Sequence, residues 1–429
     1  MENDGHDVPN DLENQYIPLA TSIQSKLDRL CALSSQCCIY RVPDGLRDAN
    51  PKAHTPKVVS VGPLHHGNES LRAMEEQKQR YLQAYLHRTN KNLLFYIKII
   101  KEKETKLRRC YAEPISFTSD ELVEIVLVDA VFIIEVMLRS FEGFEGVDHI
   151  FGNPWLFNDV WYDLLLLENQ LPFFILDDLF DPEIFAHSSS NGKSLSIVEL
   201  FYKFLITGTG IEGTNGNLDR IRSSKIEHFV DLLRQAYIPL KPKDTKFRFI
   251  PPPSITELHQ AGVKFQVGSS KNLFDIVFSK GILEIPKLTL FSNVTEMIFR
   301  NLLSFEQCYC KKEYLNEYIV IMCCLVKTAK DMDLLVKYGI VENNLGDNSK
   351  GATLINELGD RAIINGYDFY FADVCKELDA YYKVPWNTWK ANLKQNHFNT
   401  PWAIVSLIAA GFLLILTFIQ AVCSIISVT

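Results

Sequence analysis

Histidines and carboxylates in the first half of the chain are the side chains best suited to acid–base chemistry. His54, His65 and His66 form the densest group of imidazoles, and a neutral imidazole can bind a metal ion or move a proton. Adjacent side chains diverge in both strands and helices, and no carboxylate lies at ligand spacing in the same loop. The pattern therefore favours structural hydrogen bonds by these histidines over a metal site.

Two carboxylates are predicted to be buried. Asp129 lies within the apolar stretch Leu122 to Leu138, and Glu168-Asn169-Gln170 follows the apolar run Leu164 to Leu167. A buried carboxylate is costly unless it is paired. An acid–base couple is one interpretation, but without an accompanying nucleophile the sequence favours an interhelical polar network or a cap on a neighbouring helix.

The common motifs of enzyme chemistry are missing or misplaced. Gly208, Gly210 and Gly213 match GxGxxG, but they follow a predicted helix, whereas a dinucleotide site needs a strand, a turn and then a helix. The sequence contains no GxxxxGK[ST], GxSxG or HExxH motif. We therefore predict no catalytic, cofactor-binding or metal-binding residues, no cofactor and no small-molecule substrate.

The ten cysteines do not predict a metal site or a disulfide framework. The neighbours Cys37-Cys38 and Cys323-Cys324, and the pair Cys308 and Cys310, lack the CxxC spacing that brings two thiolates to one zinc ion. Reduced thiols are expected in a long chain without an export signal.

One segment is strongly basic. Lys91 to Cys110 holds seven basic residues against two glutamates, a net charge of +5. Such a patch could bind anionic lipid, although a solvated helix face is the commoner reason for this pattern.

Apolar periodicity and turn residues predict a mainly helical body. Thr118 and Glu121 form a capping-box pattern that opens the helix running to about Leu138. Prolines between Ile39 and Gly67 instead predict an extended segment that crosses another surface. The other predicted helices are 74–86, 93–107, 157–169, 195–206, 293–305, 312–338 and 351–358.

A small β-hairpin is predicted in the second half. Val263 to Val267 and Leu273 to Phe278 have the composition of short strands. Ser279-Lys280-Gly281 supplies a three-residue turn with a glycine for positive φ, and Ile282 to Ile285 forms the returning strand before Pro286. The fold class is therefore mainly α (α+β).

The C-terminal stretch predicts a membrane anchor. Residues 398–429 carry no charged side chain, and an α-helix needs roughly 20 apolar residues to cross about 30 Å of hydrocarbon. We therefore expect one transmembrane helix and a lipid bilayer as a partner. The predicted anchor residues are Trp402, Ala403, Leu413, Leu414, Phe418 and Val422.

Flanking charges predict the topology. Lys383, Lys390 and Lys394 precede the span and no basic residue follows it, which places the bulk in the cytosol. The chain also starts with acidic residues, unlike a signal peptide. We expect a tail-anchored, single-pass protein at the plasma membrane or an endomembrane. Its formal charge of -8 argues against a nucleic-acid partner.

Composition and linker patterns divide the chain into five parts. Polar residues 187–193 and Gly-rich residues 208–217 mark a linker zone. The predicted parts are a loose N-terminal arm 1–36, a helical domain 37–186, a linker zone with one helix 187–222, a helical domain with the hairpin and a juxtamembrane helix 223–400, and the anchor 401–429.

Several motifs, in order from about residue 39 to the C-terminus, together resemble the plant family known as domain of unknown function 247. The motifs are Ile39-Tyr-Arg-Val-Pro, Asn50-Pro-Lys-Ala-His-Thr-Pro, Val61-Gly-Pro-Leu-His-His-Gly, Leu167-Glu-Asn-Gln-Leu-Pro-Phe-Phe, Gly281-Ile-Leu-Glu-Ile-Pro and Asn399-Thr-Pro-Trp-Ala. The resemblance implies a single-span plant membrane protein, and some members are linked to pollen self-incompatibility recognition in grasses. Members are not established enzymes, so the resemblance implies no catalytic residues.

We therefore expect a non-enzymatic membrane-anchored plant protein that acts by protein–protein interaction, in recognition or signalling, with an unknown protein partner. One alternative is an enzyme, hydrolase-like, with an unrecognised acid–base site at Asp129, Glu168 or His65. The other is a lipid-binding module, which requires Lys91 to Arg109 to lie on the same side as Trp402.

Overall fold

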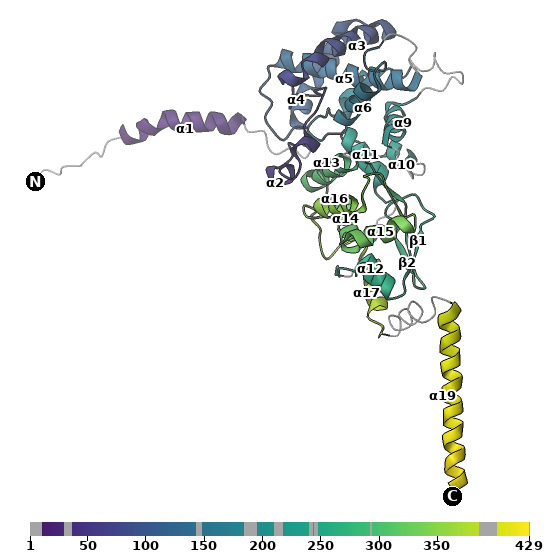
Figure 1. The fold of residues 1–429 in the computed structure, drawn as a ribbon. Coiled ribbons are helices and arrows are strands. Elements are labelled where there is room, and N and C mark those ends of the chain that lie inside the picture. Colours follow the sequence, from purple (N-terminus) through teal and green to yellow (C-terminus); the bar gives the residue numbers. More distant parts are fainter. Residues whose placement is uncertain are drawn as a thin grey trace, which may run out of the picture.

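The computed structural model shows a mainly helical protein with small sheets. It describes residues 11–29, 37–142, 148–183, 195–209, 218–239, 243, 248–291, 294–385 and 401–428. Figure 1 shows an elongated body from which two helices extend in different directions, α1 (Asp11–Arg29) and α19 (Pro401–Val428). Buried apolar side chains form one cluster that runs from Cys38 to Leu378.

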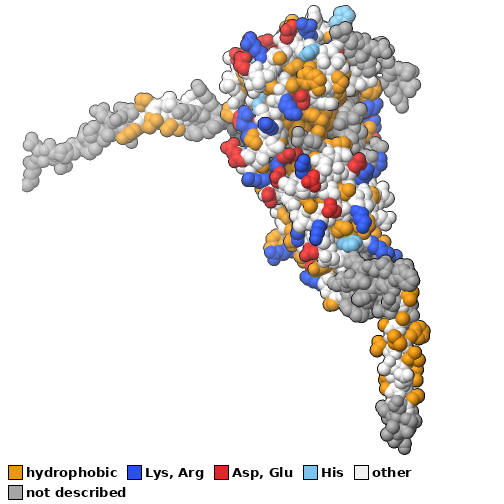
Figure 2. Space-filling view, viewed as in Figure 1, with side chains coloured by type: hydrophobic (Ala, Val, Ile, Leu, Met, Phe, Trp, Pro, Cys, Tyr) orange, Lys and Arg blue, Asp and Glu red, His pale blue; other side chains and the backbone are white. Residues whose placement is uncertain are grey.

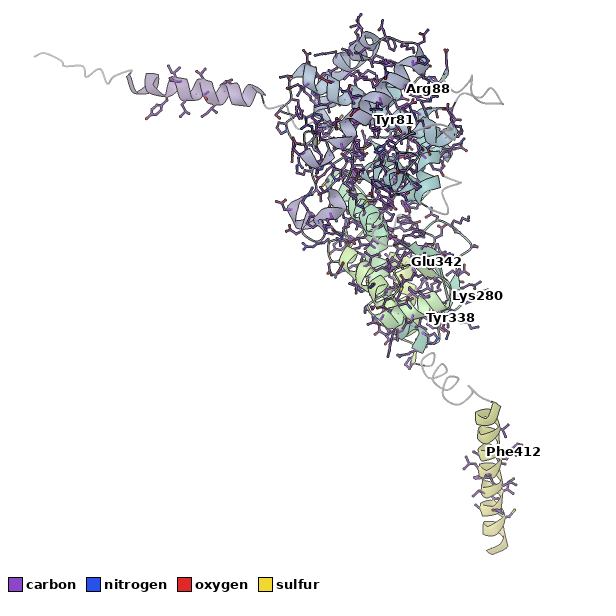
Figure 3. All side chains as sticks on the ribbon, turned by 45° about the horizontal axis from the view of Figure 1, so that its top comes forward. Tyr81, Arg88, Lys280, Tyr338, Glu342 and Phe412 are labelled. Atoms are coloured by element: carbon purple, nitrogen blue, oxygen red, sulfur yellow. The ribbon has the colours of Figure 1, made fainter. Side chains whose placement is uncertain are left out.

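Helix α5 (Ser119–Glu142) is the centre of the upper half of the body. Its residues from 125 to 138 are all buried, as expected for a helix that is apolar on every side. Four helices pack against it: α3 (Ala73–Thr89), α4 (Leu93–Arg109), α7 (Phe173–Leu179) and α9 (Ile197–Thr209). Helix α6 (Pro154–Asp163) completes this half, in which Figure 3 places Tyr81 and Arg88.

Helix α13 (Val294–Tyr309) has the central place in the lower half, where it contacts α11, α14 and α16. The helices around it are α10 (Leu218–Ser223), α11 (Phe229–Tyr237), α12 (Ile255–Gln260), α14 (Tyr314–Leu325), α15 (Ala329–Lys337), α16 (Asn348–Gly359) and α17 (Ala372–Tyr382).

Two small sheets lie in the lower half. The first has the order β1-β3-β2, with β1 (Lys264–Val267) parallel and β2 (Val277–Ser279) antiparallel to β3 (Ile282–Ile285). The second pairs β4 (Leu288–Leu290) with β5 (Val341–Asn343) in parallel. Figure 3 labels Lys280, Tyr338 and Glu342 in this region.

The predicted hairpin is confirmed, with a shorter turn. Ser279 pairs with Ile282, so Lys280 and Gly281 alone form the turn, with φ of 51° and 77°. Two consecutive positive φ angles match the twist of the flanking strands. The strand expected from Leu273 starts only at Val277, and the parallel pairing of β1 was not predicted.

Most predicted helices are confirmed, but two boundaries are wrong. The helix predicted over 157–169 ends at Asp163, because the side-chain amides of Asn169 and Gln170 donate hydrogen bonds to the carbonyls of Asp163, Leu164 and Leu166. The helix predicted over 312–338 is two helices, α14 and α15. Thr328 and Asp331 form a capping box that starts the second one.

The segment 37–67 connects the two halves of the body. It contains the short helices α2 (Asp44–Arg47) and η1 (Pro51–His54), and its other residues are not helical. Backbone hydrogen bonds join Ile39 to Cys110 and Ala112 after α4, and η1 packs against α13. The predicted extended segment is confirmed apart from these two short helices.

The predicted membrane anchor is contradicted. Residues after Pro401 do form the helix α19, and Figure 2 shows apolar side chains along it. However, no helix in the described part of the chain is long and apolar enough to cross a membrane.

This finding corrects the expected transmembrane helix, the tail-anchored single-pass topology and the membrane location with a cytosolic bulk. Of the predicted anchor residues, Leu413, Leu414, Phe418 and Val422 are exposed on α19. The side chains of Trp402 and Ala403 lie outside the described residues. The division into five parts stays a prediction.

Candidate functional site

Buried polar side chains hold the segment 37–67 against the helices. Each of them bonds a backbone group of this segment, and each is at most 1% exposed. We call this set the polar clamp; its members are Lys78, Asp129, Asp163, Glu168, Asn169, His228 and Asn301. Because a segment without regular structure leaves its backbone groups unpaired, side chains must satisfy them when it is buried.

Glu168 is the most highly connected member of the polar clamp. Its carboxylate accepts the N–H of Val42 at 2.7 Å and the Nε2–H of His65 at 3.1 Å, and it pairs with Arg41 and Arg47. Burial raises the pKa of Glu168, but these hydrogen bonds and charges outweigh burial, and its pKa lies below the usual value. A carboxylate held ionised by two guanidinium groups is a poor general acid and a weak base.

Lys78 and Asp129 form a buried ion pair between α3 and α5. The Lys78 Nζ lies 2.6 Å from Asp129 Oδ1 and 2.7 Å from Glu75 Oε1. It also donates to the Ser60 carbonyl at 2.9 Å, while Asp129 Oδ2 accepts the Gly62 N–H at 2.8 Å. Burial lowers the pKa of Lys78, but attraction to the two carboxylates outweighs burial and raises it.

Asp163 and Asn169 bind consecutive backbone groups. Asp163 accepts the N–H groups of residues 57, 58 and 59 at 2.8–2.9 Å. Asn169 accepts the Val61 N–H and donates to the Val59 carbonyl. These side chains fix the register of the segment that leads into the two adjacent histidines.

His65 and His66 diverge, as predicted. His65 turns toward Glu168, whereas His66 packs edge-on against Phe117, with ring centroids 5.6 Å apart. His54 is buried and contacts Asn301; burial lowers its pKa to about 4. Among the described residues, no group of three or more His, Cys, Asp or Glu is arranged to hold a metal ion.

The predicted polar network is confirmed for Asp129 and Glu168. Gln170 also caps a neighbouring helix, since its Oε1 accepts the N–H groups of Phe229 and Val230 at the start of α11. Glu168 and an imidazole are within hydrogen-bond distance, as the enzyme alternative requires. However, the Glu168 side chain is 0% exposed, so the pair is not open to a substrate.

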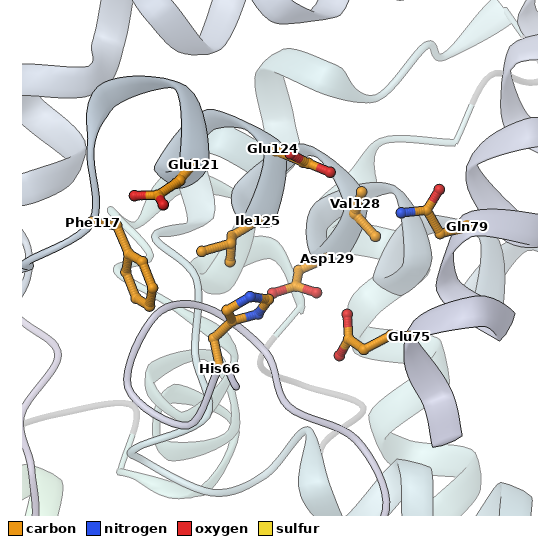
Figure 4. A pocket seen from close by; sticks show the side chains of 9 residues that line it. All are labelled: His66, Glu75, Gln79, Phe117, Glu121, Glu124, Ile125, Val128 and Asp129. Carbon is orange, nitrogen blue, oxygen red and sulfur yellow. The ribbon is translucent and has the colours of Figure 1, made fainter. Parts of the chain in front are cut away.

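A cavity of about 210 Å³ lies beside the polar clamp, between α3, α5 and the loop that carries His66. Figure 4 shows the His66 ring between Phe117, Asp129 and Glu75. We call this cavity the acidic pocket. Its lining residues are His66, Glu75, Gln79, Phe117, Glu121, Glu124, Ile125, Val128 and Asp129.

The acidic pocket has a buried floor and an exposed rim. Ile125, Val128 and Asp129 of α5 are at most 6% exposed, whereas Gln79, Glu121 and Glu124 are exposed. Glu121 is held by the Thr118 N–H and hydroxyl, each at 2.8 Å. Glu121, Glu124 and Val128 lie on one side of α5 because they are spaced i, i+3 and i+7 along the helix.

Of the residues that line the acidic pocket, the sequence predicted only Asp129 and His66 as candidates for chemistry. Glu121 was noticed only as part of a helix cap. Glu121, Glu124 and Val128 have the i, i+3, i+7 spacing of one helix face, which is a usable signal. Glu75 and Gln79 come from α3, and no sequence pattern connects that helix to α5.

The basic stretch on α4 is largely neutralised by its neighbours. Lys91, Lys101 and Lys103 pair with Asp181, Asp120 and Asp178, and Arg108 pairs with Glu104. Figure 1 places α4 in the upper half of the body and α19 beyond its lower end. This arrangement fits a solvated helix face and contradicts the geometry required by the lipid-binding alternative.

The glycine triplet is only partly covered by the structure. Gly208 lies in the last turns of α9, which supports a helix before the triplet rather than a strand. Gly210 and Gly213 lie outside the described residues.

The fold is a mainly helical body whose two halves are joined by the largely extended segment 37–67, held by the polar clamp. Comparison with known sequences assigns this chain to a family. Residues 39–416 match the family DUF247, described as plant protein of unknown function, and the chain belongs to this family. The match confirms the resemblance carried by the sequence motifs.

Two relatives from Arabidopsis thaliana extend the similarity over almost the whole chain. The chain is 30% identical to the "UPF0481 protein At3g47200", covering 91% of this chain and 87% of the relative. It is 21% identical to the "Putative UPF0481 protein At3g02645", covering 89% of each. No solved structure matches this chain.

Proposed function

We propose that this protein acts without enzymatic chemistry, by binding a protein partner, and that α1 is the recognition helix. The observation that carries the proposal is the exposed apolar side of α1. Its Tyr16, Ile17, Leu19 and Ile23 are 46–60% exposed. Figure 2 shows these apolar side chains along a helix that extends away from the body.

The spacing of these residues suits a groove on another protein. Tyr16, Leu19 and Ile23 follow the i, i+3, i+7 pattern of one helix face, which is the pattern by which amphipathic helices are bound in apolar grooves. An isolated helix of this length is marginal in water, and Pro18 inside it removes a backbone hydrogen bond. A partner that covers the apolar side would stabilise α1.

The polar clamp supports a non-enzymatic role. Its carboxylates and imidazoles are occupied by backbone groups and by one another, as described above for Glu168 and Asp129. Buried, fully bonded polar groups fix a single conformation. The proposal therefore assigns them to holding a rigid body that displays α1.

The test compares Ile23→Glu with Ser25→Glu in the full chain. Both substitutions add one negative charge to α1 at exposed positions, but Ser25 lies on the opposite side of the helix from Tyr16, Leu19 and Ile23. Affinity-purified complexes from plant tissue, analysed by size-exclusion chromatography with light scattering, would report a defined stoichiometric partner.

We expect the complex to form with the wild-type chain and with Ser25→Glu, and to be lost with Ile23→Glu. Burying one large aliphatic side chain contributes about 1.5–3 kcal/mol, so the affinity should fall at least roughly tenfold. Equal binding by the two variants would contradict the role of α1.

A further inference from the structure

The acidic pocket has a strongly one-sided charge. Among the nine lining residues that the structure describes, four are carboxylates and none is Lys or Arg. Lys78 stands behind the floor, paired with Glu75 and Asp129, and it offsets one of these charges. Four carboxylates against one ammonium leave a formal charge of -3.

Some polar groups of the acidic pocket are left without partners inside the protein. The carboxylate of Glu124 makes no interaction with the described residues, in contrast to that of Glu121. The Nδ1 atom of His66 is buried, yet it has no hydrogen-bond partner in the part of the chain that is described. Buried polar atoms are normally paired, so this nitrogen, on a residue that lines the cavity, is open to a hydrogen-bonding group.

The rest of the lining is apolar or aromatic. Ile125 and Val128 form an aliphatic floor, and the ring of Phe117 forms one wall (Figure 4). A cation gains from carboxylates and from the face of an aromatic ring, whereas a methylene chain gains from the aliphatic floor. Both requirements are met by an ammonium group on an alkyl stem.

We infer that the acidic pocket binds an alkylammonium group. Its volume of about 210 Å³ is below the ~300–1,000 Å³ typical of pockets for drug-sized ligands, so it suits a single alkylamine or one lysine side chain. The ammonium would lie near Glu124, Glu121 and the outer oxygen of Glu75, with the stem on Ile125 and Val128. This site is independent of α1 and of the partner proposed for it.

The test uses isothermal titration calorimetry on the full chain. n-Butylamine is the probe for the ammonium group, and n-butanol is a neutral probe of similar size. We expect the amine to bind at least tenfold more tightly than the alcohol, and its affinity to fall as salt is raised, because rim charges are screened. Equal affinity for the two probes would overturn the inference.

Two substitutions test the residues. Glu124→Gln removes an exposed, unpartnered charge from the rim and should weaken amine binding about three- to tenfold. Glu102→Gln is the matched control, since Glu102 is an exposed glutamate on α4 outside the acidic pocket, and it should leave the affinity unchanged. An unchanged affinity in Glu124→Gln would contradict the site.

A third variant supplies the ligand internally. Gln79→Lys places an ammonium on the rim, where it can reach the carboxylates, and should abolish n-butylamine binding without lowering the Tm. Retention of full binding in this variant would also overturn the inference.

A second probe distinguishes a free amine from a lysine side chain. Nα-acetyl-lysine methylamide carries the same ammonium stem with a peptide backbone. If the pocket accepts a lysine from a protein, this probe should bind at least as tightly as n-butylamine. If the pocket is built for a free amine, the backbone should weaken binding.

Discussion

His65 and His66 are adjacent in the chain, yet they belong to regions of opposite character. His65 contacts the polar clamp through Glu168, whose carboxylate is shared by two arginines, this imidazole and a backbone N–H. His66 lies in the acidic pocket, where its Nδ1 and the neighbouring Glu124 have no partner among the described residues. Asp129 joins the two regions, since it is bonded in the polar clamp and also lines the floor of the acidic pocket.

The difference shows how to separate polar groups that stabilise a fold from those available to a ligand. In the polar clamp every side chain is hydrogen-bonded or ion-paired inside the protein, so removing one partner leaves another unsatisfied. On the rim of the acidic pocket, Glu124 faces solvent and has no partner among the described residues, so its removal should change binding and not folding. The predictions below test this contrast.

Lys78→Met should have the largest effect on stability. It removes the cation from Asp129 and Glu75, and breaking a buried pair costs about 3–5 kcal/mol because one charge stays uncompensated. Denaturant unfolding measures the loss. The double variant Lys78→Met with Asp129→Leu should recover much of it, and a single-variant loss below about 1 kcal/mol would contradict the assignment.

His228→Gln should reveal a pH-dependent part of the polar clamp. Burial lowers the pKa of His228 to about 4, while an unfolded histidine titrates near 6.5. As the pH falls, the imidazole therefore takes up a proton in the unfolded chain before it does so in the folded chain. The contribution of neutral His228 to folding stability is complete above pH ~6.5 and is lost as the pH falls toward 4.

The difference in unfolding free energy between the wild type and His228→Gln should consequently be largest at neutral pH. It should narrow by roughly 3 kcal/mol at pH 4, as measured by urea unfolding across this range. A gap independent of pH would show that the imidazole does not titrate differently in the two states.

Glu168→Gln should destabilise the fold by about 1–3 kcal/mol, because Arg47 and His65 lose a buried charged acceptor. Glu113→Gln provides the control. Glu113 pairs with Arg41, which is also a partner of Glu168, but this pair is exposed. The substitution should therefore lower the unfolding free energy by at most about 1 kcal/mol. Equal losses in thermal unfolding would mean that burial does not distinguish the two carboxylates.

Glu124→Gln should have the smallest effect on stability, within about 0.5 kcal/mol, since the residue is exposed and unpartnered among the described residues. A larger loss of unfolding free energy would show that Glu124 stabilises the fold, as the residues of the polar clamp do. It would also weaken the contrast between the two regions.

Local sequence predicted those features that depend on neighbouring residues. The hairpin at Lys280-Gly281, predicted with a turn one residue longer, and the Thr118 cap were found because the residues that form each of them lie within three positions of one another. The early end of α6 and the break before Thr328 were missed. The first depends on amides that bond back to the helix. The second follows from the Thr328–Asp331 capping box, which is a local pattern that the sequence contains and the prediction overlooked.

The predicted membrane anchor rested on a long uncharged apolar stretch, and the described helices do not include a span. The polar network predicted at Asp129 and Glu168 is confirmed, because a buried carboxylate needs partners. Their partners Lys78 and Arg47 could not be predicted, since each lies more than 50 positions away from its carboxylate.

By itself, the sequence determined the helical class, the hairpin, the clamped segment and the membership of a plant family, because periodicity, proline and glycine positions and short motifs are local properties. Only the tertiary structure decided which carboxylates have partners inside the protein and which remain available to a ligand. Pairing and burial depend on side chains brought together from α3, α5, the loop after α6 and the segment 37–67, and no local pattern specifies those contacts.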